Sequence, residues 1–289
     1  MLRHGRTIAA SIGAAALAGA IAWGVAAETT VPLSGVLHIH GMAVDAADRS
    51  RLLLATHHGV WRTGPDGTAT LVSETQDDFM GFTAHPADEG VFFASGHPAG
   101  GGNLGFVRSD DGARTWSRIA MGGDEPADFH AMDVSPADPA IVYGLYGELR
   151  VSRDGGESWR AVGAPPADVI ALAASAEDAS TVFAATRSGL LVSRDAGASW
   201  EAAHPARQPA SAVEVAPDGT GYAFVVGQGV LRRAGPGLPW EPAGEGFGDR
   251  VLLHLTADPA DPSRVFAVTD EGVVVASPDG GESWAAFGG

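Results

Sequence analysis

The sequence predicts an all-β fold, a six-bladed β-propeller in which each blade contributes four strands. The first observation is a short motif that recurs about every 40 residues, a period typical of propeller blades. The second is that each repeat contains short runs of β-branched and aromatic residues, such as VFAAT (182–186) and GLLVS (189–193). The third is that turns rich in Gly, Pro and Asp separate these runs. Six units extend from about residue 37 to about residue 287, and a seventh blade is the alternative.

The recurring motif approximates the pattern S-x-D-x-G-x-x-W. Its four full copies are SDDGARTW (109–116), SRDGGESW (152–159), SRDAGASW (193–200) and SPDGGESW (277–284). Two degraded copies, GPDGTATL (64–71) and RAGPGLPW (233–240), occupy the remaining units. Asp and Ser side chains can bond the backbone of a tight turn, Gly permits its left-handed positions, and a Trp can anchor the hairpin. The motif is therefore interpreted as a structural turn.

The composition excludes several kinds of chemistry. The formal net charge is −17, and all 18 basic side chains are Arg. An acidic surface repels a phosphate backbone, so nucleic acid is excluded as a partner. Cys is absent, which excludes disulfides, thiol catalysis and thiolate metal sites. We expect a monomer in which any metal ion is held by His, Met, carboxylate or backbone groups.

The first 27 residues are interpreted as a targeting segment. MLRHGR supplies two Arg, and an uncharged run of small apolar residues follows at 7–27. Cleavage after Ala27 fits a signal peptide, while an uncut segment is long enough to serve as a membrane anchor. Residues 28–289 are then a single propeller domain, exported to the periplasm, the cell surface or the medium.

The most unusual stretch is LHIHGMAVD (37–45), which places His38, His40 and Met42 at alternate positions of a predicted first strand. Side chains at alternate positions share one face of a strand, and first strands line the channel of a propeller. Aligning the first strands of the units puts Met80 and His130 level with His40. Asp78, Asp128 and Asp168 then lie level with His38, two positions earlier.

A second group of imidazoles is expected on the same face. THHG (56–59) and SGHPAGGGNLG (95–105) form turns between the second and third strands, and these turns lie beside the starts of the first strands. The predicted site therefore combines imidazole, thioether and carboxylate groups at one mouth of the channel. Its candidate metal ligands are His38, His40, Met42, His57, His58, Asp78, Met80, His97, Asp128, His130 and Met132. Imidazole with thioether favours copper and imidazole with carboxylate favours zinc; the methionines tilt the choice towards copper. A small polar ligand is the alternative occupant.

The repeated motif resembles the Asp-box (BNR) repeat of sialidase-like propellers. The whole chain resembles exported bacterial Asp-box proteins commonly labelled glycosyl hydrolases, through His38–Gly41, Ser95–Pro98 and Asp128–His130. It is also similar to photosystem II assembly factors, which are protein-binding propellers. The resemblance implies a motif between the third and fourth strands, away from the site. Sialidases use three channel Arg and a Tyr–Glu pair, which the inward positions here lack, so sialidase chemistry is not expected.

Two other functions remain open at this point. A glycoside hydrolase needs two carboxyl groups about 5–9.5 Å apart, and Asp78, Asp128 and Asp168 on neighbouring blades are the candidates. A scaffold that binds a membrane-complex protein is the other. The way the ring closes is also open, and residues 28–36 could add a strand to the last blade.

Overall fold

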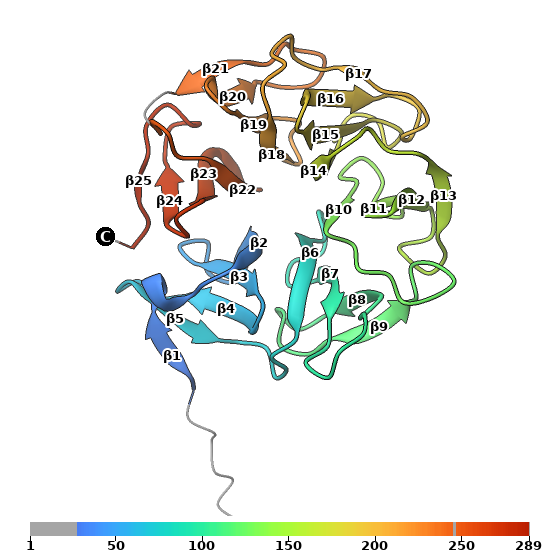
Figure 1. The fold of residues 1–289 in the computed structure, drawn as a ribbon. Helices are drawn as coiled ribbons and strands as arrows, with labels where there is room; N and C mark the ends of the chain where they lie inside the picture. Colours follow the sequence, from blue (N-terminus) through green and yellow to red (C-terminus); the bar gives the residue numbers. More distant parts are fainter. Residues whose placement is uncertain (1–27, 245–246, 289) are drawn as a thin grey trace, which may run out of the picture.

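The computed structural model describes residues 28–244 and 247–288, which form a ring of six antiparallel sheets around a central channel (Figure 1). The predicted all-β, six-bladed propeller is confirmed. The expected targeting segment, 1–27, lies outside the described residues. Within the described ranges the structure contains no helix with the length and apolar character needed to cross a bilayer.

Each blade is built from one continuous stretch of chain, with its first strand at the channel and its last at the rim. Blades 1 to 3 comprise β2 (Ile39–Val44), β3 (Leu52–Thr56), β4 (Gly59–Thr63), β5 (Thr68–Leu71), β6 (Asp78–Ala84), β7 (Phe92–His97), β8 (Phe106–Ser109), β9 (Ser117–Ala120), β10 (Ala131–Val134), β11 (Val142–Tyr146), β12 (Glu148–Ser152) and β13 (Arg160–Gly163). Blades 4 to 6 comprise β14 (Val169–Ala174), β15 (Val182–Thr186), β16 (Gly189–Ser193), β17 (Glu201–Ala202), β18 (Ala210–Val215), β19 (Gly221–Val225), β20 (Gly229–Arg233), β21 (Glu241–Gly244), β22 (Leu252–Asp258), β23 (Asp261–Thr269), β24 (Val274–Ser277) and β25 (Ala285–Ala286).

The beginning of the described chain joins blade 1, whereas the sequence had suggested the last blade. The short strand β1 (Thr30–Pro32) pairs antiparallel with β5 and becomes its outer neighbour. The Thr30 and Thr70 hydroxyls lie 3.0 Å apart across this pair. One 3-10 turn, η1 (Leu33–Gly35), then carries the chain towards β2. Blade 1 therefore has five strands, and its outermost edge is covered.

The recurring motif forms the turn between the third and fourth strands, as expected. In blade 3 the Ser152 Oγ accepts a hydrogen bond from the Gly156 backbone N–H (2.7 Å) and donates to Asp154 (2.7 Å). The Asp154 carboxylate accepts from the Ser158 N–H at 2.9 Å. The Trp159 indole N–H closes the turn on the Gly156 carbonyl at 2.9 Å. Each conserved position of the pattern thus satisfies a polar group of one tight turn.

The other copies repeat this arrangement. Ala113 occupies the Gly position of the first copy and has a φ of 67°, the left-handed conformation that Gly usually supplies. Hydrogen bonds, first of all from the Ser side chain four residues on, lower the pKa of three motif aspartates to about 2: Asp154, Asp195 and Asp279.

The hydrophobic cores lie between neighbouring blades. Trp116, for example, packs on Phe79 and Phe82 in a cluster that joins blades 1 and 2. The cluster between blades 6 and 1 combines Phe266 and Val268 with residues of β2 and β3. The ring therefore closes through side chains, with each of the two flanking blades keeping its own strands.

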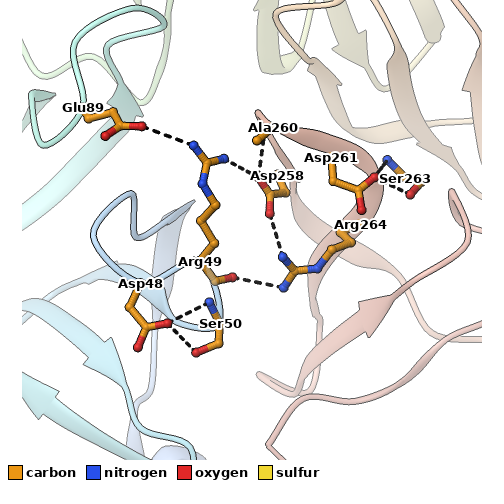
Figure 2. A network of polar contacts seen from close by, with 9 residues as sticks. All are labelled: Asp48, Arg49, Ser50, Glu89, Asp258, Ala260, Asp261, Ser263 and Arg264. Atoms are coloured by element: carbon orange, nitrogen blue, oxygen red, sulfur yellow. Dashed lines mark hydrogen bonds and ion pairs between the residues drawn. The ribbon is translucent and has the colours of Figure 1, made fainter.

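A network of ion pairs reinforces this closure at the end of the channel opposite to the strand starts (Figure 2). Arg49 of blade 1 donates to Asp258 of blade 6 at 2.8 Å and to Glu89 of blade 2 at 3.2 Å. Arg264 donates to the other Asp258 oxygen at 2.7 Å and to the Arg49 carbonyl at 3.0 Å. The Asp258 side chain is only 1% exposed, so a buried carboxylate links blades 6 and 1, and Arg49 extends the network to blade 2.

Candidate metal centre at the channel mouth

The six inner strands enclose a channel cavity of about 670 Å³. Their side chains line it from end to end, as the sequence predicted for the first strands. His38, His40 and His130 lie at the end where these strands begin. The same end receives the turns between second and third strands, which bring in further imidazoles.

The first His/Asp group joins blades 1 and 2. His57, in the turn between β3 and β4, places its Nδ1 2.8 Å from Oδ2 of Asp78, the first residue of β6. His40 on β2 places its Nε2 3.7 Å from the other oxygen of Asp78. The His40 and His57 rings approach edge to face at 4.3 Å between centroids. One ligand atom from each residue lies within 4.8 Å of the other two.

The second His/Asp group joins blades 2 and 3. Asp128 precedes β10, and its Oδ2 lies 2.5 Å from Nε2 of His130 and 3.1 Å from Nε2 of His97. The His97 Nδ1 lies 2.9 Å from the carbonyl oxygen of Gly102, in the Gly-rich insertion after β7. When Nδ1 carries the proton of that hydrogen bond, Nε2 of neutral His97 presents a lone pair to the carboxylate of Asp128. Such an arrangement is stable only with a proton or another cation between the two atoms.

Three buried polar atoms at the mouth have no hydrogen-bond partner among the described residues: His40 Nε2, Asp78 Oδ1 and Asp128 Oδ1. Burial of an unsatisfied polar atom costs about 1–3 kcal/mol in folded proteins. The Asp128 residue is 6% exposed, so water reaches it poorly from outside. All three atoms belong to the two His/Asp groups, which identifies the groups as a place where a polar partner can be accommodated.

Electrostatics distinguish the imidazoles of the two groups. Burial, followed by the neighbouring His57, lowers the pKa of His40, so its imidazole is neutral near pH 7. A hydrogen bond that His130 donates to the Asp128 carboxylate raises the pKa of His130, with burial acting in the opposite direction. The Asp78 charge also raises the pKa of His130, and His130 lowers that of His40. The two groups are therefore close enough to influence each other.

Other predicted residues lie outside the two groups. The His38 ring lies 5.0 Å from that of His57, and its backbone adopts a φ of 54°. His58 is exposed, with its ring 6.5 Å from that of His57. Asp168 is exposed at a φ of 60° and belongs to neither group.

The methionines are placed differently from the sequence-based expectation. Met42 and Met132 are each 6% exposed and belong to the hydrophobic clusters between blades. Met80 is half-buried and pairs with Ser95 of β7. For Met42 the reason is a β-bulge at His40, where the register to β3 shifts between Ile39 and Gly41. A bulge adds one residue to the strand and reverses the alternation beyond it, so Met42 turns away from His40.

Sequence reasoning missed three channel-lining residues: Asp133 on β10, Glu214 on β18 and His254 on β22. Burial raises the pKa of Asp133 to about 6 and that of Glu214 to about 8, and lowers the pKa of His254 to about 4. The available signal was an acidic residue inside an apolar strand, as in HAMDV and ASAVEV. Bulges recorded in β18 and β22 turn Glu214 and His254 towards the channel.

Comparison with known proteins places the fold among solved propellers. A GH74 enzyme from Niastella koreensis matches with a TM-score of 0.58 and 13% identity, over 86% of this chain and 45% of that chain. YCF48 bound to D1 peptide matches with a TM-score of 0.53 and 17% identity, over 90% and 85% of the two chains. The extracellular domain of BT4673 from B. thetaiotaomicron matches with a TM-score of 0.53 and 10% identity, over 86% and 33%.

The chain shares their propeller fold. The expected resemblance to glycosyl-hydrolase-like and assembly-factor-like propellers is thus confirmed at the level of the fold. The chain spans less than half the length of the GH74 enzymes that it matches. No protein-family model matches the sequence, and no curated protein matches it.

Proposed function

We propose that this protein is an exported metal-binding propeller whose channel mouth holds divalent transition-metal ions in two sites of two imidazoles and one carboxylate each. The observation that carries the proposal is the buried, unpartnered His40 Nε2, which faces an equally unpartnered oxygen of Asp78. A neutral imidazole nitrogen and a carboxylate oxygen repel each other as acceptors unless a cation or a proton lies between them.

The donor set favours zinc. Two imidazoles and one carboxylate are a known set for zinc sites that leave the fourth tetrahedral position to water or substrate. Zinc–ligand bonds of about 2.0–2.1 Å place tetrahedral ligands about 3.3 Å apart. The ligand atoms of both groups already lie within 4.8 Å of one another, so small side-chain rotations suffice. With Met42 and Met132 packed in the cores, the thioether argument for copper is weakened.

The hydrogen bond at His97 supports the second site. Ligating imidazoles usually donate their other ring N–H to a carbonyl or carboxylate, which fixes the ring and its tautomer. The Gly102 carbonyl lies where it can accept such a bond from Nδ1 of His97, leaving Nε2 for the metal. The Gly-rich insertion is itself fixed by the Ala99 N–H, which donates to Asp77 at 2.9 Å.

The test is metal content and zinc titration of the protein purified without a His tag, together with four variants. We expect two zinc equivalents for the wild type and one each for His40→Ala and His130→Ala, with the lost site weakened at least about 100-fold. The double variant should bind none. His204→Ala, which removes an imidazole outside both groups, is the matched control and should retain both sites.

Two results would contradict the proposal. One is wild-type protein that contains no zinc or copper and takes up neither in titration. The other is a double variant that binds as much metal as the wild type. Competition between Zn²⁺ and Cu²⁺ distinguishes the two ions, because Cu²⁺ binds nitrogen and oxygen donors more tightly wherever the geometry permits.

A protein-binding scaffold is the second candidate function, because exposed apolar side chains surround the same mouth. Leu37, Tyr146 and Leu253 are 62%, 45% and 40% exposed. YCF48, a propeller of the same fold, has been solved with a bound peptide. Co-purification of a membrane-complex protein that persists in chelator and is lost in Leu37→Ser/Leu253→Ser would favour this function. Co-purification that depends on metal would favour the metal-binding proposal.

A further inference from the structure

The channel below the His/Asp groups has the size and walls of a small-molecule site. Its volume of about 670 Å³ lies within the range of about 300–1,000 Å³ common for ligand pockets. Ala131, Ala171 and Ala212 supply small apolar walls. Ligand pockets of this kind usually combine apolar walls with a few convergent polar groups. Here those groups are two carboxyls.

The two carboxyls approach the cavity from blades 3 and 5. Asp133 is held in place by the Thr83 hydroxyl at 3.0 Å and by the Ala174 N–H at 2.7 Å. Glu214 has the backbone of Ala257 as its hydrogen-bonding neighbour. Among the described residues, no Arg or His nitrogen lies within the 4.0 Å of an ion pair with either carboxyl. Enclosed carboxyl groups normally have a cationic partner, so two enclosed carboxyls without one are unusual.

The remaining channel groups do not balance this charge. The imidazoles of His40 on β2 and His254 on β22 both have lowered pKa values and are neutral at pH 7. The inner strand of blade 4 contributes no titratable side chain to the cavity lining. Arg49, at the far end, is already bound to Asp258 and Glu89. His130, the channel imidazole whose pKa is raised, is already bonded to Asp128 at the mouth. A cation that lets both carboxyls ionise at pH 7 would therefore come from outside the described residues.

We propose that the channel binds an amphipathic organic cation, with its ammonium or guanidinium head between Asp133 and Glu214 and its apolar body directed to the mouth. Ile170 and Leu253, which are 42% and 40% exposed, line the channel at the mouth and offer apolar contact. Ser211 is the position of blade 5 that aligns with Ile170 and Leu253. Glu214 lies three residues further along the same strand, which places it about 10 Å deeper in the channel at 3.3 Å per residue. A head group with an apolar body of about that length fits the distance.

An organic head fits the pair better than a metal ion does. Neither Asp133 nor Glu214 belongs to a group of three potential ligands whose atoms lie within 4.8 Å, among the residues described. A planar or tetrahedral nitrogen head with several N–H donors spans a larger gap and gives each carboxyl a charge-assisted hydrogen bond. The site is thus separate from the two His/Asp groups and does not depend on their metal.

Binding has a predictable proton balance. Burial, and then the Asp133 charge, raises the pKa of Glu214 to about 8, so its carboxyl is protonated at pH 7. When the cation binds, Glu214 releases its proton to solvent and the positive head replaces it. Below pH 8 the affinity should therefore rise about tenfold for each unit of pH.

The test is calorimetric titration of the chelator-treated protein with 4-phenylbutylammonium, whose alkylammonium stays charged between pH 6 and 8. The neutral alcohol 4-phenylbutan-1-ol is the matched ligand. We expect the ammonium to bind at least about tenfold more tightly at pH 8 than at pH 6.5, with release of one proton, and the alcohol to bind weakly at both. Glu214→Gln should lose the pH dependence and at least about tenfold of the affinity at pH 8. Glu271→Gln, which removes a surface acid paired with Arg250, should bind as the wild type does.

Three outcomes would overturn the inference: no binding of the ammonium at pH 8, equal binding of the ammonium and the alcohol, or unchanged binding by Glu214→Gln. The comparison of the two ligands uses wild-type protein, so it decides the matter even if the variant folds poorly. Repeating the titration with the His40→Ala/His130→Ala protein separates this site from the metal proposal, since ammonium binding should survive in that variant.

Discussion

Replacing Asp258 by Asn should open the seam between blades 6 and 1. Asp258 Oδ1 accepts hydrogen bonds from Arg49 and from the Ala260 N–H at 3.0 Å, and Oδ2 accepts from Arg264 (Figure 2). Asn has nearly the same shape and retains one acceptor. It removes the negative charge that both guanidinium groups share, and it places an amide NH₂ against one of them.

The expected loss follows from burial. Removing one partner of a buried ion pair typically costs about 3–5 kcal/mol, because the other charge stays buried without compensation. The Arg49 and Arg264 side chains are 34% and 35% exposed, so water can partly replace the carboxylate. We therefore expect Asp258→Asn to lower the free energy of unfolding by about 2–4 kcal/mol.

Urea unfolding followed by tryptophan fluorescence at pH 7 measures this difference, with the m-value reporting whether the transition stays cooperative. Asp261→Asn is the matched control, since the exposed Asp261 carboxylate bonds only Ser263 within the network of Figure 2. The free energy of unfolding of Asp261→Asn should stay within about 1 kcal/mol of the wild-type value. If Asp258→Asn also stayed within about 1 kcal/mol, the buried carboxylate would not be what fastens the ring.

Two further predictions concern the repeated turns. The pKa of Asp154 in the folded protein is about 2, below its ordinary value of 3.8, so the stability that the carboxylate contributes is present above about pH 4 and is lost as the pH falls towards 2. Unfolding followed by circular dichroism between pH 5 and pH 2 should show this loss. Constant stability below pH 4 would contradict the prediction. Gly156→Ala should lower the free energy of unfolding by about 3 kcal/mol or more, because φ at Gly156 is 95° and the new Cβ would overlap the Phe106 ring. Gly155→Ala is the matched comparison: φ is 71° and the space around the new Cβ is open, so the same urea assay should show a loss of about 1 kcal/mol. Equal losses would mean that the Phe106 ring moves aside freely.

The sequence predicts the number of blades and the face that carries the imidazoles because both follow from local rules. The turn motif recurs once per blade, and its Ser152 and Asp154 bonds are made within a few residues. A four-stranded meander then fixes which ends of the strands meet. For this reason His57 and His97, far apart along the chain from His40 and His130, were placed at the right mouth.

The inner side-chain positions could not be predicted in the same way. Period-2 alternation pointed Met42 into the channel, whereas a bulge at His40 reverses the direction of the residues that follow. Equivalent shifts occur in β6, β14, β18 and β22, whereas the pairing of β10 with β11 shows none. A bulge depends on hydrogen bonding to the neighbouring strand, which no single strand sequence reveals. The same effect hid Glu214, which a strict alternation would have buried in the core.

Ring closure by side chains has a consequence for assembly. The faces that meet at the seam carry Phe266 and Val268 on blade 6 and Met42 and Val44 on blade 1, with Arg49 and Asp258 at one end. A molecule that opens there exposes two mutually complementary surfaces, and each of them fits the opposite surface of a second opened copy. The seam within one molecule is then replaced by a seam between two molecules, so the onset of this association depends on protein concentration as well as on temperature. The seam is therefore where misassembly of this propeller would begin.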